Sequence, residues 1–312
     1  MTIKPIVIGG VTVPNNVFFA PLAGFSTAEM RHAAYKAGAG LCFTEMVSAK
    51  GLMYAPDASE DLLVNLDENK VCAVQIFGNE PEFIKKAAGS EYLKNYDIID
   101  LNMGCPMPKI YNNGAGSALL KDLRLAEEIV KAAKTANKPV SVKIRIGLDD
   151  NHIVTEEFAK ALEGAGADLI TVHGRTKAAV YAGEVNYEEI ARAKRAVKIP
   201  VIANGGIFTV RDAEILMDRT GADGVMVARG ALENPLIFAE ITGKTVDFTL
   251  KDLVKEQILL TAKRYGFKRA GVVLRSRIAY YLKGVRGGKK FKERAFKAEN
   301  ADELIAVVEE AL

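Results

Sequence analysis

A thiol stands in a tight turn directly after a strongly apolar segment of this chain. The segment Asp97–Leu101 has the composition of a buried strand, and Asn102-Met103-Gly104-Cys105-Pro106 follows it. A cysteine in such a turn lies where a ligand would sit and not inside a core. Three roles stay open for Cys105: nucleophile, general acid or passive residue. A nucleophile needs a base to form its thiolate, whereas a thiol with its ordinary pKa of about 8.5 can donate its proton.

Polar side chains also stand at the ends of four other apolar runs. They are Gln75 after 71–74, Lys143 after 140–142, His173 after 169–172 and Asn204 after 201–203. Five buried strands that finish in Asn, Gln, Lys or His indicate one shared polar site. In an α/β barrel the carboxyl ends of all strands meet at one face, and that face holds the active site. The pattern therefore predicts a (β/α)8 barrel, the TIM barrel fold, with its active face at these strand ends.

Strand and helix patterns alternate along the chain, which is typical of βαβ units and a parallel sheet. Strands are predicted near 17–21, 41–46, 71–76, 97–102, 139–145, 168–173, 200–204 and 223–228. Helical patterns between them cover 27–36, 81–93, 123–136, 155–165, 187–196 and 210–219. Eight repeats within about 225 residues fit a closed barrel better than a doubly wound sheet. Residues 6–13 read as a hairpin with a Gly-Gly turn, which is expected to cover the bottom of the barrel.

The strand pattern ends after Ala239, and residues 249–312 form a helical region without proline. We therefore predict two domains, a catalytic α/β barrel over residues 1–243 and a small C-terminal helical domain over residues 244–312. The chain has 312 residues, of which 49% are hydrophobic and 26% charged. That length is ample for a large core, since a barrel takes about 250 residues as one domain.

Several classes of protein do not fit this composition. No apolar stretch approaches the roughly 18 residues that span a bilayer, and the N-terminus lacks the apolar core of a signal peptide. We therefore expect a cytoplasmic monomer without a membrane partner. The three cysteines cannot form a full disulfide framework, and none stands at zinc-type spacing from another. Cys42 and Cys72 lie inside apolar runs and are interpreted as core thiols, and no metal is expected.

The formal net charge is only +3, but the charge is unevenly distributed. Between Thr261 and Ala298 the chain carries thirteen Lys or Arg residues against one acidic residue, Glu293. Such an asymmetry favours a polyanionic partner, and the alternative is a solvated helical face. The candidate contacts are Lys263, Arg264, Lys268, Arg269, Arg275, Arg277, Lys283, Arg286, Lys289, Lys290 and Lys292.

Two glycine-containing turns follow the predicted seventh and eighth strands. They are Asn204-Gly205-Gly206 and Ala228-Arg229-Gly230. Glycines let backbone N–H groups approach an anion, and in barrels these two loops are the usual phosphate site. A single Gly-Gly turn is weak evidence, but two at these positions, with Arg229 beside the second, favour a phosphate site over plain turns.

Lys143 is a cation near the end of a strand that is otherwise apolar. A lysine is rarely buried without a partner, so a bound anionic group or an enolate-like oxygen is expected. The alternative is a salt bridge to Glu45 or Asp100 across the barrel. Gln75 offers a donor and an acceptor, which suits a heterocycle with amide-like edges. His173 is expected on the same rim.

The ordered set of these segments resembles the tRNA-dihydrouridine synthases, flavoenzymes that reduce a uracil base in transfer RNA. The resemblance covers nearly the whole chain. Its segments are Ala20–Gly24, Phe43–Ala49, Gln75–Gly78, Asn102–Pro106, Gly114–Ser117, Lys143–Arg145, His173–Thr176, Asn204–Ile207, Ala228–Ala231 and Tyr280–Gly284. Each segment alone is modest, but together and in this order they are specific.

The resemblance implies a set of roles for residues of this chain. Flavin mononucleotide (FMN) would be lined by Pro21, Leu22 and Ala23, with Gln75 and Lys143 at its ring and His173 close by. Its phosphate would be held by Asn204, Gly205, Gly206, Ala228 and Arg229. NADPH would reduce the flavin, hydride would pass to C6 of uracil, and Cys105 would protonate C5 as the general acid. Asn102, Arg145 and Arg175 would lie where the base is read.

Three positions depart from the pattern of that family. Leu22 replaces a more usual methionine, Gly206 stands where an acidic residue is common, and Ser276-Arg277 replaces a Lys-His pair. Two alternatives remain: a small-molecule ene-reductase or dihydroorotate-type dehydrogenase, and a tRNA-binding chaperone with a silent barrel. The basic tail argues against the first, and the intact set Gln75, Cys105, Lys143 and His173 argues against the second.

Overall fold

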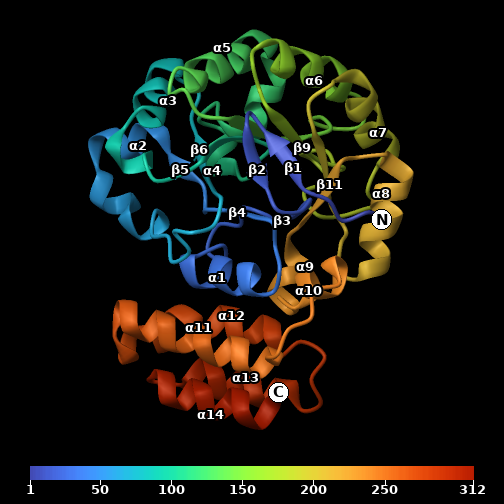
Figure 1. The fold of residues 1–312 in the computed structure, drawn as a ribbon. Helices are drawn as coiled ribbons and strands as arrows, with labels where there is room; N and C mark the ends of the chain where they lie inside the picture. The colour runs from blue at the N-terminus through green and yellow to red at the C-terminus, as the bar shows by residue number, and fades with distance from the viewer.

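Eight parallel strands close into a barrel in the computed structural model, which describes residues 1–312 (Figure 1). The strands are β3 (Val17–Phe19), β4 (Leu41–Phe43), β6 (Cys72–Phe77), β7 (Ile98–Met103), β8 (Val140–Arg145), β9 (Leu169–His173), β10 (Val201–Asn204) and β11 (Gly224–Val227). The barrel closes where β11 pairs with β3, in the register Val225 to Val17. The two-residue strand β5 (Val47–Ser48) adds to β6 outside this ring. The predicted TIM barrel is confirmed.

The predicted hairpin forms and closes one end of the barrel. Strands β1 (Ile6–Ile8) and β2 (Val11–Val13) pair antiparallel around Gly9 and Gly10, whose φ angles are +53° and +95°. Two successive positive φ angles suit the tight hairpin turn that favours glycine. The side chain of Ile8 packs among residues of the barrel interior such as Ile98 and Ile202. Figure 1 shows the hairpin in front of the ring of strands.

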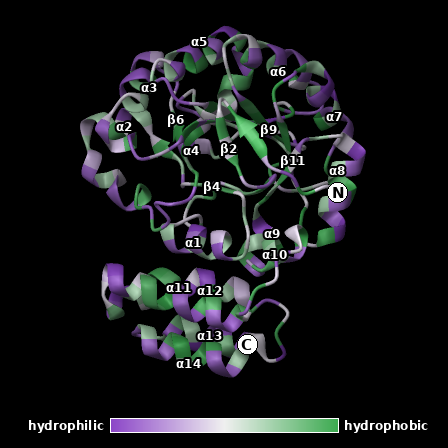
Figure 2. Ribbon diagram, in the orientation of Figure 1, coloured by the Kyte–Doolittle hydropathy of each residue, from purple (hydrophilic) through white to green (hydrophobic).

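Helices surround the barrel and alternate with its strands. They are α1 (Ala28–Lys36), α2 (Ala49–Tyr54), α3 (Pro81–Ala88), α4 (Pro108–Tyr111), α5 (Leu123–Lys134), α6 (Thr155–Gly164), α7 (Tyr187–Ala196), α8 (Val210–Thr220), α9 (Arg229–Glu233) and α10 (Ile237–Thr242). The helix predicted over 81–93 ends early, at Ala88, because Gly89-Ser90 interrupts it before a short 3-10 turn. The strand predicted over 41–46 ends at Phe43, and the carboxylate of Glu45 accepts a hydrogen bond from the backbone N–H of Gly24. Figure 2 shows apolar strands inside and hydrophilic outer helix faces.

The helical region that the sequence predicts after the barrel consists of four helices. They are α11 (Leu250–Tyr265), α12 (Phe267–Tyr281), α13 (Gly288–Lys297) and α14 (Ala301–Ala311). They share a hydrophobic cluster of their own, which includes Ile258, Leu274 and Leu304. We retain the domain boundary between residues 243 and 244 as a proposal. None of the helices is both long and apolar enough to cross a membrane.

The helical region packs against α1 and α9 of the barrel (Figure 1). Lys36 of α1 forms an ion pair with Glu256 of α11 at 2.6 Å. At the other contact, Lys283, just after α12, pairs with Glu233 of α9 at 2.6 Å. The second contact places the carboxyl end of α12 beside the active face of the barrel.

Candidate active site

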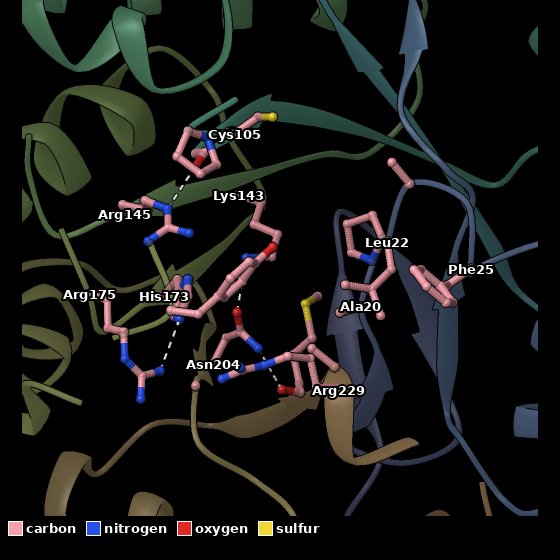
Figure 3. Close-up of a pocket in the computed structure, with 18 of the residues that line it drawn as sticks. Ala20, Leu22, Phe25, Cys105, Lys143, Arg145, His173, Arg175, Asn204 and Arg229 are labelled. Atoms are coloured by element: carbon pink, nitrogen blue, oxygen red, sulfur yellow. Dashed lines mark hydrogen bonds between the residues drawn. The ribbon is translucent and has the colours of Figure 1, made fainter. Parts of the chain in front are cut away.

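A cavity of about 420 Å³ opens at the carboxyl ends of the barrel strands. This volume is typical of a small-molecule or cofactor site. Residues predicted from the sequence as site residues all line it: Pro21, Leu22, Ala23, Gln75, Asn102, Cys105, Lys143, Arg145, His173, Arg175, Asn204, Gly205, Gly206, Ala228 and Arg229. In the view of Figure 3, Lys143 and His173 lie between Cys105 at the top and Arg229 at the bottom.

Strand alternation explains why these polar side chains meet. In β8, Val142 and Ile144 point outward and join the large hydrophobic core beneath the helices. Successive side chains of a strand point to opposite faces, so Lys143 and Arg145 point into the barrel. The parallel register then sets Lys143 beside Asn102 and Arg145 beside His173 on the neighbouring strands.

The turn that carries Cys105 is held by the side chain of Asn102. The Asn102 Oδ1 atom accepts hydrogen bonds from the backbone N–H of Cys105 at 2.9 Å and of Gly104 at 3.2 Å. On the other side, Ser117 donates its backbone N–H and its hydroxyl to the Cys105 carbonyl. The following loop is thereby tied to the turn.

The Cys105 thiol keeps its proton at neutral pH. Burial raises its pKa, against smaller opposing effects of the Met107 backbone and the charges of Arg145 and Lys143. No His, Asp or Glu side chain is hydrogen-bonded to its sulfur. A nucleophilic cysteine needs such a base, so this environment suits proton donation better than nucleophilic attack.

Lys143 has no carboxylate partner. Its Nζ atom donates to Asn204 Oδ1 at 3.0 Å, and Asn204 in turn donates to the carbonyl of Met226. Burial, with the nearby charge of Arg145, lowers the pKa of Lys143 to about 8. The alternative salt bridge to Glu45 or Asp100 is wrong, because both carboxylates accept hydrogen bonds from other groups. A cation in this position favours a bound anion.

His173 is neutral at physiological pH. Its ring is buried, and burial holds its pKa well below the usual range. The four nearby cations, Lys143, Arg145, Arg175 and Arg229, lower it further. A neutral imidazole has one donor and one acceptor nitrogen, so it can bind a polar ligand edge without adding charge.

Arg145 and Arg175 hold a loop over the cavity. Arg145 donates to the carbonyls of Thr176 and Val180, each at 2.8 Å, and to Gly104 at 2.9 Å. Arg175 donates to the carbonyl of Gly183 at 3.0 Å. These bonds occupy much of both guanidinium groups. The sequence did not indicate this use, because the contacts form across a loop whose path depends on the fold.

The loop brings Tyr181, which the sequence analysis missed, to the cavity. Its ring lies 6.5 Å from that of His173, and the guanidinium of Arg229 lies 4.7 Å from its centre. The helical region adds Tyr280, whose ring packs edge-on against Phe25 at 5.2 Å. Tyr181 stands in a segment without a distinctive local pattern, so only its aromatic residue type was available as a signal. Tyr280 begins the segment Tyr280–Gly284, which carries part of the family resemblance, but the sequence analysis assigned this side chain no role at the cavity.

The predicted phosphate end has three free donors. Gly205 and Gly206 have φ angles of +129° and +72°, and neither backbone N–H is bonded to another group of the protein. A Cβ atom on Gly205 would lie 3.1 Å from the His173 ring. Arg229 forms no ion pair and lies over the rings of Tyr181 and Phe208. Two free N–H groups and a free guanidinium fit a phosphate.

The departures from the family pattern occupy defined places. Leu22 lines the cavity, where a methionine side chain of similar volume is expected. Gly206 has a positive φ, which is strained for residues that carry a Cβ atom. Arg277 is only 8% exposed and lies against the Gly24 carbonyl of the barrel.

Structure also separates the basic candidates of the helical region into two groups. Four are engaged within the protein: Arg264 with Glu29 and Asp61, Arg275 with the Ala298 carbonyl, Arg277 with Gly24, and Lys283 with Glu233. Seven form no ion pair: Lys263, Lys268, Arg269, Arg286, Lys289, Lys290 and Lys292. A count of charges along the sequence therefore overstates the free positive surface. No group of three or more His, Cys, Asp or Glu side chains is arranged to hold a metal.

Comparison with known proteins decides the family. The family model described as dihydrouridine synthase matches residues 18–312. The chain belongs to the dihydrouridine synthase family. It is 35% identical to a probable tRNA-dihydrouridine synthase 1 of Synechocystis, over 99% of this chain and 90% of that protein. It is 34% identical to tRNA-dihydrouridine synthase B of Pasteurella multocida, over 96% of this chain and 94% of the relative.

Solved structures support the barrel of this dihydrouridine synthase family member. Morphinone reductase superposes with a TM-score of 0.58 at 15% identity, over 78% of this chain and 89% of that chain. A histamine dehydrogenase from Rhizobium gives a TM-score of 0.58 at 12% identity, over 82% of this chain and 50% of that chain. At such low identity the likeness concerns the fold alone. Family membership makes the chain an oxidoreductase, because making dihydrouridine is a reduction of uracil.

Proposed function

We propose that this chain reduces the C5–C6 double bond of uridines in tRNA with FMN and NADPH, and that Cys105 is the general acid. One observation carries the proposal. A single cavity joins a protonated thiol, a lysine without a carboxylate partner and a set of free phosphate donors. A flavin-dependent reduction of an electron-poor double bond needs these three features together.

The residues present fit FMN. Arg229 and the free N–H groups of Gly205 and Gly206 match a phosphate, and the amide of Gln75 matches the polar edge of a flavin ring. Lys143 supplies the positive charge that an electron-rich ring edge requires. When bound, FMN that NADPH has reduced supplies the hydride for the reaction.

The proton is the contribution of Cys105. Uracil gains a hydride at C6 and needs a proton at C5, and a thiol with a raised pKa holds that proton until the transfer. The S–H bond breaks, a C–H bond forms at C5, and the thiolate is left near Arg145 and Lys143, whose charges stabilise it. Solvent then returns the proton.

Two side chains near the turn are candidates to stabilise the C4 oxygen of uracil. The hydrogen bonds of Arg145 leave its Nη2 without a protein partner. Asn102 lines the same part of the cavity, but its Nδ2 already donates to Gln75 Oε1 at 2.8 Å, so Arg145 is the stronger candidate. Hydride addition at C6 places negative charge on this oxygen, so donors aimed at it lower the barrier.

An RNA substrate explains the helical region better than a small molecule does. Tyr280 contributes to the cavity wall, and free cations follow α12 in the chain at Arg286, Lys289 and Lys290. A uracil in folded RNA must leave its stack to enter such a cavity. The surrounding backbone then lies over the basic surface, which a free pyrimidine would not use.

The test is Cys105→Ala. We expect the variant to keep yellow FMN and NADPH-dependent flavin reduction but to lose dihydrouridine formation by about 10²- to 10⁴-fold, the usual contribution of a general acid. Mass spectrometry of tRNA incubated with each protein measures the product. Full activity of the variant would refute the acid role, and a protein that cannot be reconstituted with FMN would refute the flavin assignment.

A further inference from the structure

Asp100 is a fully buried carboxyl group that the proposed reaction does not use. It lies on β7, two residues before Asn102, so both side chains point into the barrel. Burial raises its pKa to about 7, although hydrogen bonds from Ser141 and Gln75 and the charge of Lys143 oppose this. A buried ionisable group so close to a reaction centre needs an explanation.

A continuous chain of hydrogen bonds connects Asp100 to the Cys105 turn. Gln75 donates its Nε2 to Asp100 Oδ2 at 2.6 Å, and its Oε1 accepts from Asn102 Nδ2 at 2.8 Å. Asn102 Oδ1 then accepts from the backbone N–H of Cys105 at 2.9 Å. The other Asp100 oxygen accepts from the Ser141 hydroxyl at 2.6 Å.

The chain has a direction that its two ends fix: the backbone N–H groups of the turn can only donate, and the ionised Asp100 carboxylate can only accept. An amide side chain can turn by 180° and exchange its donor for its acceptor, so Gln75 and Asn102 have no intrinsic orientation. If the Gln75 amide turned by 180°, its Oε1 would face Asp100 Oδ2, acceptor against acceptor. Its Nε2 would then face Asn102 Nδ2, donor against donor. If Asp100 is protonated, its O–H can donate a hydrogen bond to Ser141 Oγ after the Ser141 hydroxyl rotates. Gln75 therefore keeps the same orientation in both states.

We propose that Asp100 is a positioning residue that orients the amides of Gln75 and Asn102 and, through Asn102, holds the turn that carries Cys105. Its consequence for catalysis rests on the proposed acid role of Cys105, but its structural effect does not. The Asp100 carboxyl group contacts neither the Cys105 turn nor the cavity, so it acts on the turn only through the amides of Gln75 and Asn102.

The rate at which iodoacetamide alkylates Cys105 reports on this turn. Cys42 and Cys72 are fully buried, so Cys105 is the accessible thiol of the folded protein, and the assay requires neither FMN nor tRNA. Asp100→Leu removes the acceptor of Gln75 Nε2, so the Gln75 amide is free to move and its Oε1 holds Asn102 Nδ2 less firmly. If the turn is thereby stabilised less, by about the contribution of one neutral hydrogen bond, alkylation of Cys105 should be about two- to tenfold faster.

Matched variants show whether a faster alkylation of Cys105 comes from the lost positioning by Asp100 or from a general disturbance of the barrel interior. Asp100→Asn keeps an acceptor toward Gln75 and a donor toward Ser141, so it should restore the wild-type rate. Thr171→Val changes the same interior layer but removes only a hydroxyl without a partner, so it should leave the rate unchanged. Asn102→Ala should speed alkylation as Asp100→Leu does, and the double variant should add nothing to Asn102→Ala alone.

The outcomes decide the inference. A wild-type alkylation rate in folded Asp100→Leu, or effects of Asp100→Leu and Asn102→Ala that multiply, would overturn it. If Asp100→Leu does not fold, Gln75→Met cuts the same chain one link later and should give the same increase, and an unchanged rate there overturns the inference as well. Failure of the acid role in Cys105→Ala experiments leaves these results interpretable, because alkylation measures the turn and not the reaction.

Discussion

Arg229→Ala tests the phosphate end of the cavity most directly. The Arg229 guanidinium lies 4.7 Å from the ring centre of Tyr181 and 5.7 Å from that of Phe208, and it forms no ion pair. No acceptor within the protein depends on it, so its removal leaves no buried polar group unpaired. The effect of the substitution therefore falls on the ligand and not on the fold.

The magnitude follows from the one interaction that the substitution removes. A hydrogen bond to a charged group contributes about 1.5–3 kcal/mol. This corresponds to FMN binding that is about 10- to 150-fold weaker. Binding is weakened and not abolished, because the free N–H groups of Gly205 and Gly206 remain. Riboflavin has the same ring but no phosphate, so its affinity should change by less than about twofold.

Titration of the apoprotein with each flavin, followed by flavin fluorescence, measures both affinities. Arg229→Lys should lie between the wild type and the alanine variant, because a lysine keeps the charge but not the two-pronged geometry. Arg219→Ala is the matched control, since Arg219 also stacks on a tyrosine, Tyr187 at 4.1 Å, but does not line the cavity. Equal decreases in affinity for FMN and riboflavin would refute the assignment of Arg229 to the phosphate.

Two further predictions concern the helical region. Four cations beyond α12 form no ion pair: Arg286, Lys289, Lys290 and Lys292. Replacing them with glutamine should weaken tRNA binding. It should also reduce the slope of log affinity against log salt concentration by about 0.7–0.9 for each RNA phosphate that is no longer neutralised. Filter binding at several salt concentrations measures this slope, and Lys131→Gln on α5 with Lys160→Gln on α6 is the control. An unchanged slope would place the RNA on the barrel rim. His32 accepts or donates a hydrogen bond with Asp67 at 2.9 Å, and this bond raises the pKa of His32, assisted by the charges of Asp67 and Glu256. The stability that the His32–Asp67 contact contributes is therefore full below the ordinary histidine pKa of about 6.5 and disappears as the pH rises through the raised pKa. The Tm difference between wild type and His32→Gln should be larger at about pH 5.5 than at about pH 8.5. A Tm difference that does not change with pH would contradict this prediction.

The charged contacts between α11 and the barrel connect this titration to the site. Glu256, which lies 3.6 Å from His32, also pairs with Lys36, and Arg264 of the same helix pairs with Glu29 at 3.1 Å. These contacts set the helical region against α1, while Lys283 sets it against α9. These ion pairs lie outside the cavity, on the same interface that places Tyr280 against Phe25 of the barrel.

Much of the barrel was predictable from the sequence because its signals are local. Alternating apolar runs and helical patterns depend on neighbouring residues, and a polar side chain stands near the carboxyl end of several strands, such as Gln75 in β6 and Asn204 in β10. Parallel strands in a barrel share one active face, so the position of a side chain at a strand end was enough to assign it to the cavity.

Pairings between distant segments were decided by the tertiary structure alone. Lys143 pairs with Asn204 and not with Asp100, and Arg145 is used by the carbonyls of a loop more than thirty residues away. The chain of amides from Asp100 to Cys105 depends on the register of β6 against β7, which no single segment specifies. Likewise, Arg264 and Arg277 count as free charges in the sequence but are engaged with the barrel in the fold. Residue types and local periodicity determined which side chains reach the site. Strand register and packing determined which partner each side chain has, because hydrogen bonds and ion pairs form only between atoms that the complete fold brings within about 3 Å.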